Sequence, residues 1–293
     1  MRICTFSPFQ ILPRLIGPAL LVLFSWSPGV LAQMTPAEAQ ALVRKASQNE
    51  TAKDLNGQPF RFLLRKIDEK GDITKEIVQT KEGDIARLVL YNNQPLTDER
   101  KQQERERLDH LMTHPEEQQR RHRREQEDSE RADKLVKLLP DAFIYEYIET
   151  APGASGPVIK LRFKPNPQFS PADREAEIYH GMAGQLWIDQ NQARMVCLDA
   201  HLIADVNFGW GFLGRLYKGG SILVQQADVG YHHWETIHLK LSLTGKALMF
   251  KSLNIQTQED ESDFRPVPKD IGYQDAIRML EAPPAPTQAS AQP

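Results

Sequence analysis

Histidine and acidic side chains lie close together in residues 232–238, His-His-Trp-Glu-Thr-Ile-His, a combination that could hold a metal ion. A helical zinc motif needs two histidines four positions apart with glutamate directly after the first, whereas these pairs are five or six apart. The segment alternates like a strand, so we expect His232 and His238 on one face and His233 and Glu235 on the other. We interpret them as surface or rim histidines, with a strand-borne metal site as the alternative.

His110 and His114 have the i, i+4 spacing that brings two imidazoles of a helix within reach of one metal ion. Pro115 follows directly, and the nearby acids are ordinary members of a charged helix. We therefore expect no metal site here, and no other cofactor.

Cys197, Asp199 and His201 occupy alternate positions of one predicted strand. Groups spaced in this way are about 6 to 7 Å apart, beyond hydrogen-bond reach, so they do not predict a nucleophile with its base. The chain has neither a Gly-x-Ser-x-Gly elbow nor a Ser-x-x-Lys signature. We interpret Cys197 as a small buried apolar residue, although a reactive thiol is the alternative. We expect no catalytic residues.

Arg120, Arg121, Arg123 and Arg124 could form a patch that binds phosphate or carboxylate. Glutamate and aspartate interleave with them, which favours a solvated helix face instead. The formal net charge of the chain is −3. A mildly acidic chain gives no electrostatic reason to expect binding to nucleic acid.

Aromatic residues recur in or beside the predicted strands, where they could line the concave face of a curled sheet. An ordinary filled core is the alternative. The candidates for a ligand cavity are Phe60, Phe62, Tyr91, Tyr145, Tyr147, Trp187, Trp210 and Trp234.

Residues 1–32 have the order of a secretory signal: Arg2 and Arg14, an apolar run over 15–24, and small residues up to Ala32. The run is too short to cross a bilayer, which needs about twenty residues. We expect cleavage near Ala32, no remaining membrane span and a periplasmic or secreted protein, with an uncleaved anchor as the alternative. Cleavage takes the formal net charge from −3 to −5 and leaves one cysteine, so no internal disulfide can form.

Three segments of the sequence carry signals that predict helices. Thr35 and Glu38 form a potential capping box for a helix that reaches about Lys53. A charged segment over 97–139 predicts two helices divided at Pro115, with narrow leucine-rich stripes near 108–112 and 135–139. A short helix is expected at 273–281. The proline- and alanine-rich tail, 282–293, predicts disorder.

Alternating segments predict about ten or eleven strands, most of them in a meander over residues 143–257. Short links at 218–221 and 244–246 suit hairpins. So large an antiparallel sheet normally curls. We expect an α+β fold in which helices cover the concave face, with residues 33–281 forming one domain and 97–139 as its insertion.

This layout resembles the LolA/LppX/RseB-like group of exported bacterial proteins. The hairpin Gly-Gln-Leu-Trp-Ile-Asp over 184–189, followed by Ala-Arg-Met-Val over 193–196, is similar to the "Gly-x-hydrophobic-x-Ile-Asp" hairpin of that group. The resemblance implies an open half-barrel with a lipophilic cavity between sheet and helices, and a carrier or sensor of lipid or acylated cargo. It supplies no ligand-contacting positions that can be matched residue by residue.

Three functions are therefore considered. The leading hypothesis is an exported, non-enzymatic protein that binds a lipid or acylated protein. The second is an envelope interaction or regulatory module with a solid core, whose partner binds the helices over 97–139. A secreted hydrolase or metal enzyme is the third.

Overall fold

The computed structural model describes residues 34–52, 57–171, 173–208, 214–247 and 251–282. The predicted export segment, Trp210 and nearly all of the predicted tail lie outside these residues. The helices are α1 (Pro36–Glu50), α2 (Asp98–Thr113), α3 (Pro115–Ala142), α4 (Tyr273–Glu281) and the 3₁₀ helix η1 (Arg174–Gly181).

The strands belong to one antiparallel sheet. They are β1 (Phe60–Asp68), β2 (Gly71–Val78), β3 (Ile85–Tyr91), β4 (Gln94–Pro95), β5 (Phe143–Pro152), β6 (Pro157–Pro165), β7 (Met182–Asp189), β8 (Met195–Leu202), β9 (Val206–Phe208), β10 (Gly214–Leu216), β11 (Ser221–Asp228), β12 (Trp234–Ala247) and β13 (Lys251–Pro266). The order is β4-β3-β2-β1-β13-β12-β11-β8-β7-β6-β5, with β10 paired to β12 and β9 to β10.

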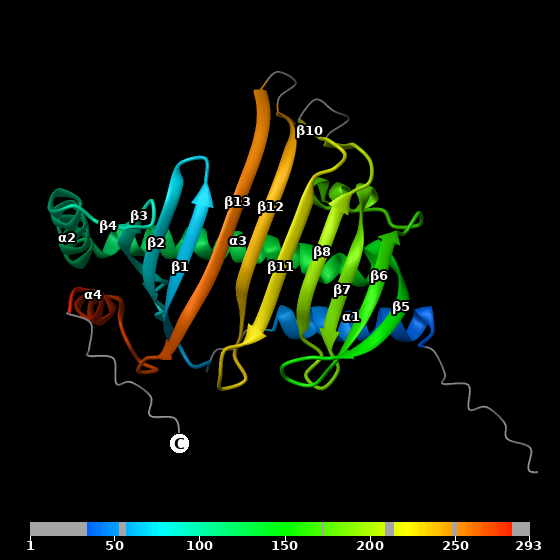
Figure 1. Cartoon of the computed structure of the whole chain (residues 1–293), viewed down its shortest axis with the longest axis horizontal. Helices are drawn as coiled ribbons and strands as arrows, with labels where there is room; N and C mark the ends of the chain where they lie inside the picture. Colours follow the sequence, from blue (N-terminus) through cyan, green and yellow to red (C-terminus); the bar gives the residue numbers. More distant parts are fainter. Residues whose placement is uncertain (1–33, 53–56, 172, 209–213, 248–250, 283–293) are drawn as a thin grey trace, which may run out of the picture. The chain divides into compact units, whose positions relative to one another are not determined.

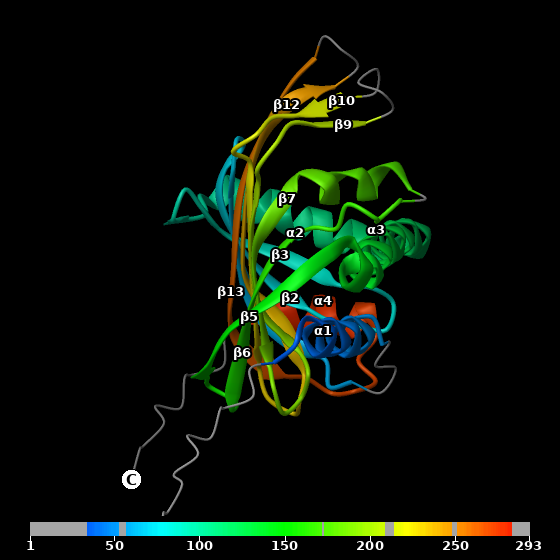
Figure 2. The same ribbon diagram turned by 90° about the vertical axis from the view of Figure 1, so that its right-hand side faces the viewer.

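The sheet is open, because the strands at its two ends, β4 and β5, do not pair with each other. The α-helices lie on one of its faces (Figures 1 and 2). The predicted fold class is confirmed: this is an α+β fold with a large open antiparallel sheet covered by helices. Thirteen strands are present in the described residues, where ten or eleven were predicted, because β4 and β9 are short and lack an alternating pattern.

The predicted simple meander is corrected by two long-range pairings. Strand β1 pairs with β13, with Leu64 opposite Glu261, and β11 pairs with β8, with Ile222 opposite Ala200. The four N-terminal strands, β1–β4, therefore continue the sheet beyond the last strand. Residues separated by about two hundred positions become neighbours, which local alternation does not indicate.

The predicted hairpin at 218–221 is wrong, because β10 pairs with β9 and β12 and not with β11. The predicted hairpin at 244–246 is also wrong. Strand β12 runs without interruption through these positions to Ala247. Gly245 serves the approach of β10, because a Cβ atom at this position would collide with the backbone oxygen of Arg215. The glycine marks a close contact between strands rather than a turn.

The helix predictions are mostly confirmed. The Thr35 side chain and Glu38 form the expected capping box of α1, which ends at Glu50, three residues early. Helices α2 and α3 divide at Pro115, and α4 has the predicted bounds. None of the helices in the described part of the chain combines the length and apolar character that a membrane span requires.

The apolar core is divided along the sheet. The largest cluster lies between strands β5–β8 and the helices α1, α3 and η1. A second cluster joins α2 and α4 to the edges of β2 and β3, around Val78, Leu108 and Ile277. The leucine stripes predicted for α2 and α3 fall into different clusters, so the two helices cover different parts of the sheet.

Candidate functional site

The largest core cluster is incompletely filled. A cavity of about 170 Å³ lies between the C-terminal half of α3, η1 and the helix-covered face of the sheet. Apolar side chains form nearly all of its wall: Leu135, Val136, Leu139, Phe143, Tyr145, Phe163, Ile178, Tyr179, Met182, Leu186, Leu198 and Ile222. We call this space the apolar cavity.

The spacing of apolar residues along α3 and along the strands explains which side chains line the cavity. In α3, Leu135 and Leu139 are one turn apart and therefore project from the same side. In the sheet, Leu186 of β7 lies opposite Leu198 of β8. The neighbouring pair on that side is Gly184 and Ala200, and Gly184 lies so close to β8 that a Cβ atom there would collide with the Asp199 carbonyl oxygen.

Two tyrosines, Tyr145 of β5 and Tyr179 of η1, bond to α3 through their hydroxyl groups and line the cavity. The hydroxyl of Tyr145 donates to the Leu139 carbonyl at 2.7 Å, and that of Tyr179 donates to the Leu135 carbonyl at 2.9 Å. Burial raises the pKa of both phenols, so both stay protonated at neutral pH. Because each hydroxyl is hydrogen-bonded to a carbonyl of α3, only the carbon atoms of the rings line the cavity.

Helix α1 packs beside α3 on the same face of the sheet (Figure 2). It presents small side chains, Ala39, Val43 and Ala46, none of them solvent-exposed, which allow a close helix–helix contact. The Ser47 hydroxyl donates to the Val136 carbonyl at 2.6 Å. Helices α1 and α3 are thus joined to each other within the helix layer.

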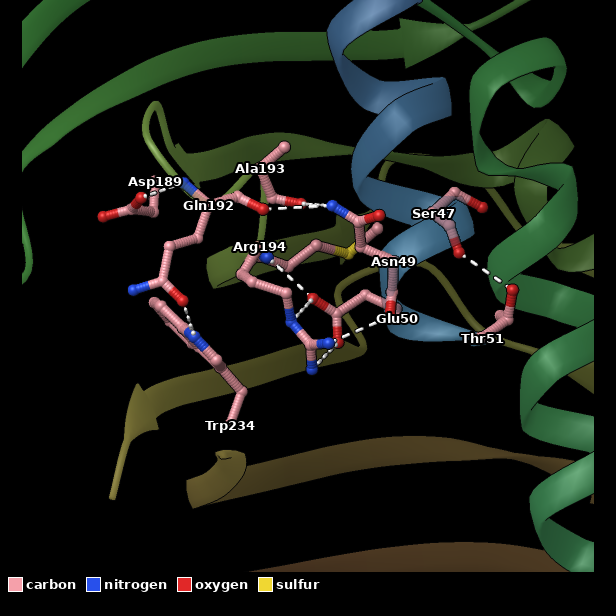
Figure 3. Close-up of polar contacts among 10 residues, drawn as sticks. Ser47, Asn49, Glu50, Thr51, Asp189, Gln192, Ala193, Arg194 and Trp234 are labelled. Atoms are coloured by element: carbon pink, nitrogen blue, oxygen red, sulfur yellow. Dashed lines mark hydrogen bonds and ion pairs between the residues drawn. The ribbon is translucent and has the colours of Figure 1, made fainter. Parts of the chain in front are cut away.

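The C-terminal end of α1 is attached to the β7–β8 hairpin (Figure 3). The Asn49 amide donates to the carbonyls of Gln192 and Ala193 at 3.0 and 3.1 Å. Glu50 accepts from the Met195 backbone N–H at 2.8 Å and is paired with Arg194 at 3.1 Å. These contacts explain why the helix stops at Glu50.

The same hairpin carries the sequence pattern discussed above. The buried Asp189 carboxylate accepts from the backbone N–H groups of Asn191 and Gln192 at 2.9 and 2.8 Å, which shapes the turn. Ala193 completes it with a φ of 49°. In this protein the turn of the hairpin binds the end of α1, and Leu186 of the same pattern lines the apolar cavity.

The eight aromatic candidates do not converge on one site. Tyr145 lines the apolar cavity, and Tyr147 lies at the margin of the same cluster. Phe60 and Phe62 belong to a separate small cluster with Ile77. Tyr91 lines a different pocket, which also contains arginines.

The two remaining described tryptophans also lie elsewhere. Trp187 falls between the core residues Leu186 and Ile188, so alternation directs it to the opposite face, where the Lys160 ammonium is 4.6 Å from its ring. Trp234 is buried and donates to Gln192 at 2.9 Å (Figure 3).

The histidine predictions have mixed outcomes. The expected shared face of His232 and His238 is wrong, because His232 lies in a turn with a φ of 58° and β12 begins only at Trp234. His233 and Glu235 do share a side, with Nε2 and Oε1 2.8 Å apart. The rings of His110 and His114 stack at 3.8 Å. The part of the chain that the structure describes contains no group of three metal-ligating side chains.

Cys197 is buried in β8, as predicted. Burial, followed by the nearby Asp199 carboxylate, raises the pKa of its thiol to about 11. A thiol with this pKa is protonated at neutral pH and is a poor nucleophile.

The four clustered arginines separate in the structure. Arg120, Arg123 and Arg124 are exposed on α3, whereas Arg121 is partly buried and lines the pocket that contains Tyr91. The interpretation as a solvated face therefore fits three of them.

Sequence reasoning missed the contribution of η1 to the apolar cavity. Ile178 and Tyr179 enter the wall from a 3₁₀ helix that has no amphipathic period long enough to recognise. The alternation of β11 marked Ile222 as a strand residue but did not show that it faces α3.

No protein-family model and no curated protein matches this chain. Among solved structures, a Vibrio parahaemolyticus domain named for outer membrane lipoprotein sorting covers 81% of this chain and 97% of its own, at 9% identity and a TM-score of 0.27. A DUF1329 family protein from Desulfovibrio piger covers 78% and 92%, at 9% identity and a TM-score of 0.23. At these TM-scores neither similarity carries an argument about this chain.

Proposed function

We propose that this protein binds the apolar part of a lipid or of an acylated protein in the apolar cavity, as a non-enzymatic carrier or sensor. The supporting observation is an incompletely filled space with an almost wholly apolar wall between α3, η1 and the sheet. We further propose that it acts in the periplasm or outside the cell, after cleavage near Ala32.

The size of the cavity suits part of a ligand. At about 170 Å³ it is close to the engineered cavity of about 150 Å³ that stays dry and accepts benzene. Drug-sized ligands occupy sites of about 300–1,000 Å³. We therefore infer that a short acyl segment enters first and that α3 moves outward to admit a longer chain, driven by apolar burial at about 25 cal/mol per Å².

Uptake of a dansyl-labelled fatty acid by the purified mature protein tests this proposal. Wild type should enhance dansyl fluorescence saturably. The variant Ile178→Trp fills the cavity from η1, where the side chain is only partly buried, and should weaken uptake at least about tenfold. Leu198→Ala enlarges the cavity and should preserve uptake.

Ile203→Trp is the matched control, because Ile203 is 41% exposed and does not line the cavity. It should bind the probe like wild type. Absence of saturable uptake by wild type, or equal uptake by the Ile178 and Ile203 variants, would contradict the proposal and favour a module with a solid core. Deletion of residues 97–139 is unsuitable as a test of that alternative, because α3 contributes Leu135 and Leu139 to the core.

A further inference from the structure

A second pocket, of about 360 Å³, lies between strands β2 and β3 and helices α2 and α3. We call it the basic pocket, because its lining contains four cationic side chains and one carboxylate, Glu104. The cations are Lys75, Arg100, Arg107 and Arg121. They come from β2, α2 and α3, so they approach the pocket from three elements.

The single carboxylate of the basic pocket, that of Glu104, already accepts hydrogen bonds from other groups. Glu104 accepts two hydrogen bonds from Arg107, both at 2.8 Å, and one from the Leu88 backbone N–H at 2.7 Å. The Arg100 guanidinium lies 3.7 Å from the centre of the Tyr91 ring, a cation–π contact that positions it without neutralising it. In the lining of the pocket, four cationic side chains therefore face a single carboxylate.

Among the four cations, Lys75 and Arg121 have neither a hydrogen-bond acceptor nor a ring contact among the described residues. Lys75 lies on the same face of β2 as Ile73, and both line the basic pocket opposite residues of α2 and α3. Burial, then the charges of Arg107 and Arg121, lowers the pKa of Lys75. Within the described residues, neither Lys75 nor Arg121 makes a hydrogen bond or an ion pair. Such ammonium and guanidinium groups are costly to bury without an acceptor.

We infer that the basic pocket binds a phosphate group, carried by a small phosphate compound or by a phospholipid headgroup. A tetrahedral anion offers oxygens in several directions, which suits a lysine and arginines that converge from different elements. The pocket shares no lining residue with the apolar cavity, so this inference is independent of the proposed function.

Calorimetric titration near neutral pH with two probes, inorganic phosphate and dihexanoyl phosphatidate, tests the inference. Wild type should bind at least one probe saturably, and more weakly at about 0.5 M salt. Lys75→Gln and Arg121→Gln should each weaken binding about tenfold or more, because each loses a hydrogen bond to a charged group. Arg123→Gln, an exposed position on the same helix, should bind like wild type.

Mass spectrometry of acetylated protein adds a local readout. A bound probe should protect Lys75 from acetylation and leave the exposed Lys137 unchanged. Protection by inorganic phosphate assigns the site to small phosphates, and protection by the phosphatidate alone assigns it to headgroups.

Two further measurements keep the test decisive. Lys75→Gln should keep or raise the thermal midpoint and should keep the fatty-acid uptake of wild type, since the replaced ammonium is partly buried and makes no hydrogen bond or ion pair. Absence of saturable binding of either probe, wild-type affinity in both variants, or a fall in the midpoint of Lys75→Gln would overturn the inference.

Discussion

At the scale of single residues, the apolar cavity depends on where polar atoms are placed. Tyr145 and Tyr179 bring two hydroxyl groups into a cluster that otherwise contains carbon and sulfur, and both donate to carbonyls of α3. A buried hydroxyl without a partner would cost about 1–3 kcal/mol. These bonds let bulky aromatic side chains form the wall while tying α3 to the rest of the core.

Replacing Tyr179 with phenylalanine should lower the free energy of unfolding by about 0.5–1.5 kcal/mol, because the bond to Leu135 is lost while the ring still fills its place. Urea denaturation measures this change. Tyr147→Phe is the matched control, since its hydroxyl contacts Thr150 in an exposed position, and its effect should stay below about 0.5 kcal/mol. Equal effects of the two variants would show that the Tyr179 bond does not hold α3.

At the scale of elements, α1 positions the helix layer through its C-terminal end. Asn49 satisfies two carbonyls of the β7–β8 turn, and Glu50 accepts from Met195 (Figure 3). The opposite end of the helix is capped by Thr35. A helix held at both ends transmits its position to α3 through Ser47.

Asn49→Ala should destabilise the attachment of α1 by about 1–3 kcal/mol, because two partly buried carbonyls lose their donor. Hydrogen exchange of the α1 amides should accelerate more than that of the β6–β7 ladder. Gln48→Ala replaces an exposed neighbour on the same helix and should leave the exchange rates unchanged. Uniform acceleration throughout the chain would contradict a local role.

At the scale of the whole molecule, the pairing of β1 with β13 gathers acidic residues from distant segments. Burial, then Glu125 and Glu235, raises the pKa of Asp84 to about 7. Burial, then Glu235, Glu259 and Asp84, raises the pKa of Glu261 to about 8. The contributing residues come from α3, β12, β13 and the start of β3, so only the assembled fold produces these shifts.

Raised carboxyl pKa values predict that this cluster destabilises the protein as pH rises. The ordinary values are 3.8 and 4.5, so between about pH 4 and 8 the native state retains protons that the unfolded chain releases. The stability contributed by Asp84 and Glu261 is therefore present at low pH and lost as pH rises through about 7 and 8.

Asp84→Asn and Glu261→Gln should each raise the free energy of unfolding at pH 8 by roughly 1–2 kcal/mol relative to wild type and change it little near pH 4. The expected gain is smaller than the full pKa shift, because water still reaches part of these side chains. Thermal denaturation across this pH range measures it. Glu127→Gln, an exposed carboxylate of α3, should show no such pH-dependent difference.

Much of the local structure followed from residue types alone. Thr35 with Glu38 identified the start of α1, Pro115 divided the charged helices, and alternation around Cys197 placed it in a buried strand. These features depend on neighbours within a few positions, which a single sequence displays. The large antiparallel sheet with a helix layer could be predicted for the same reason.

Tertiary structure alone decided where the possible sites lie. Leu135 and Ile222 meet at one cavity, and Lys75 meets Arg121, through contacts between distant segments. Gly245 allows β10 to approach β12 closely, although the residue types at 244–246 indicated a turn. Local patterns state which side chains are apolar or charged. Whether the space between them is filled, and which charges remain unpaired, depends on how closely the layers approach, and that is a property of the assembled fold.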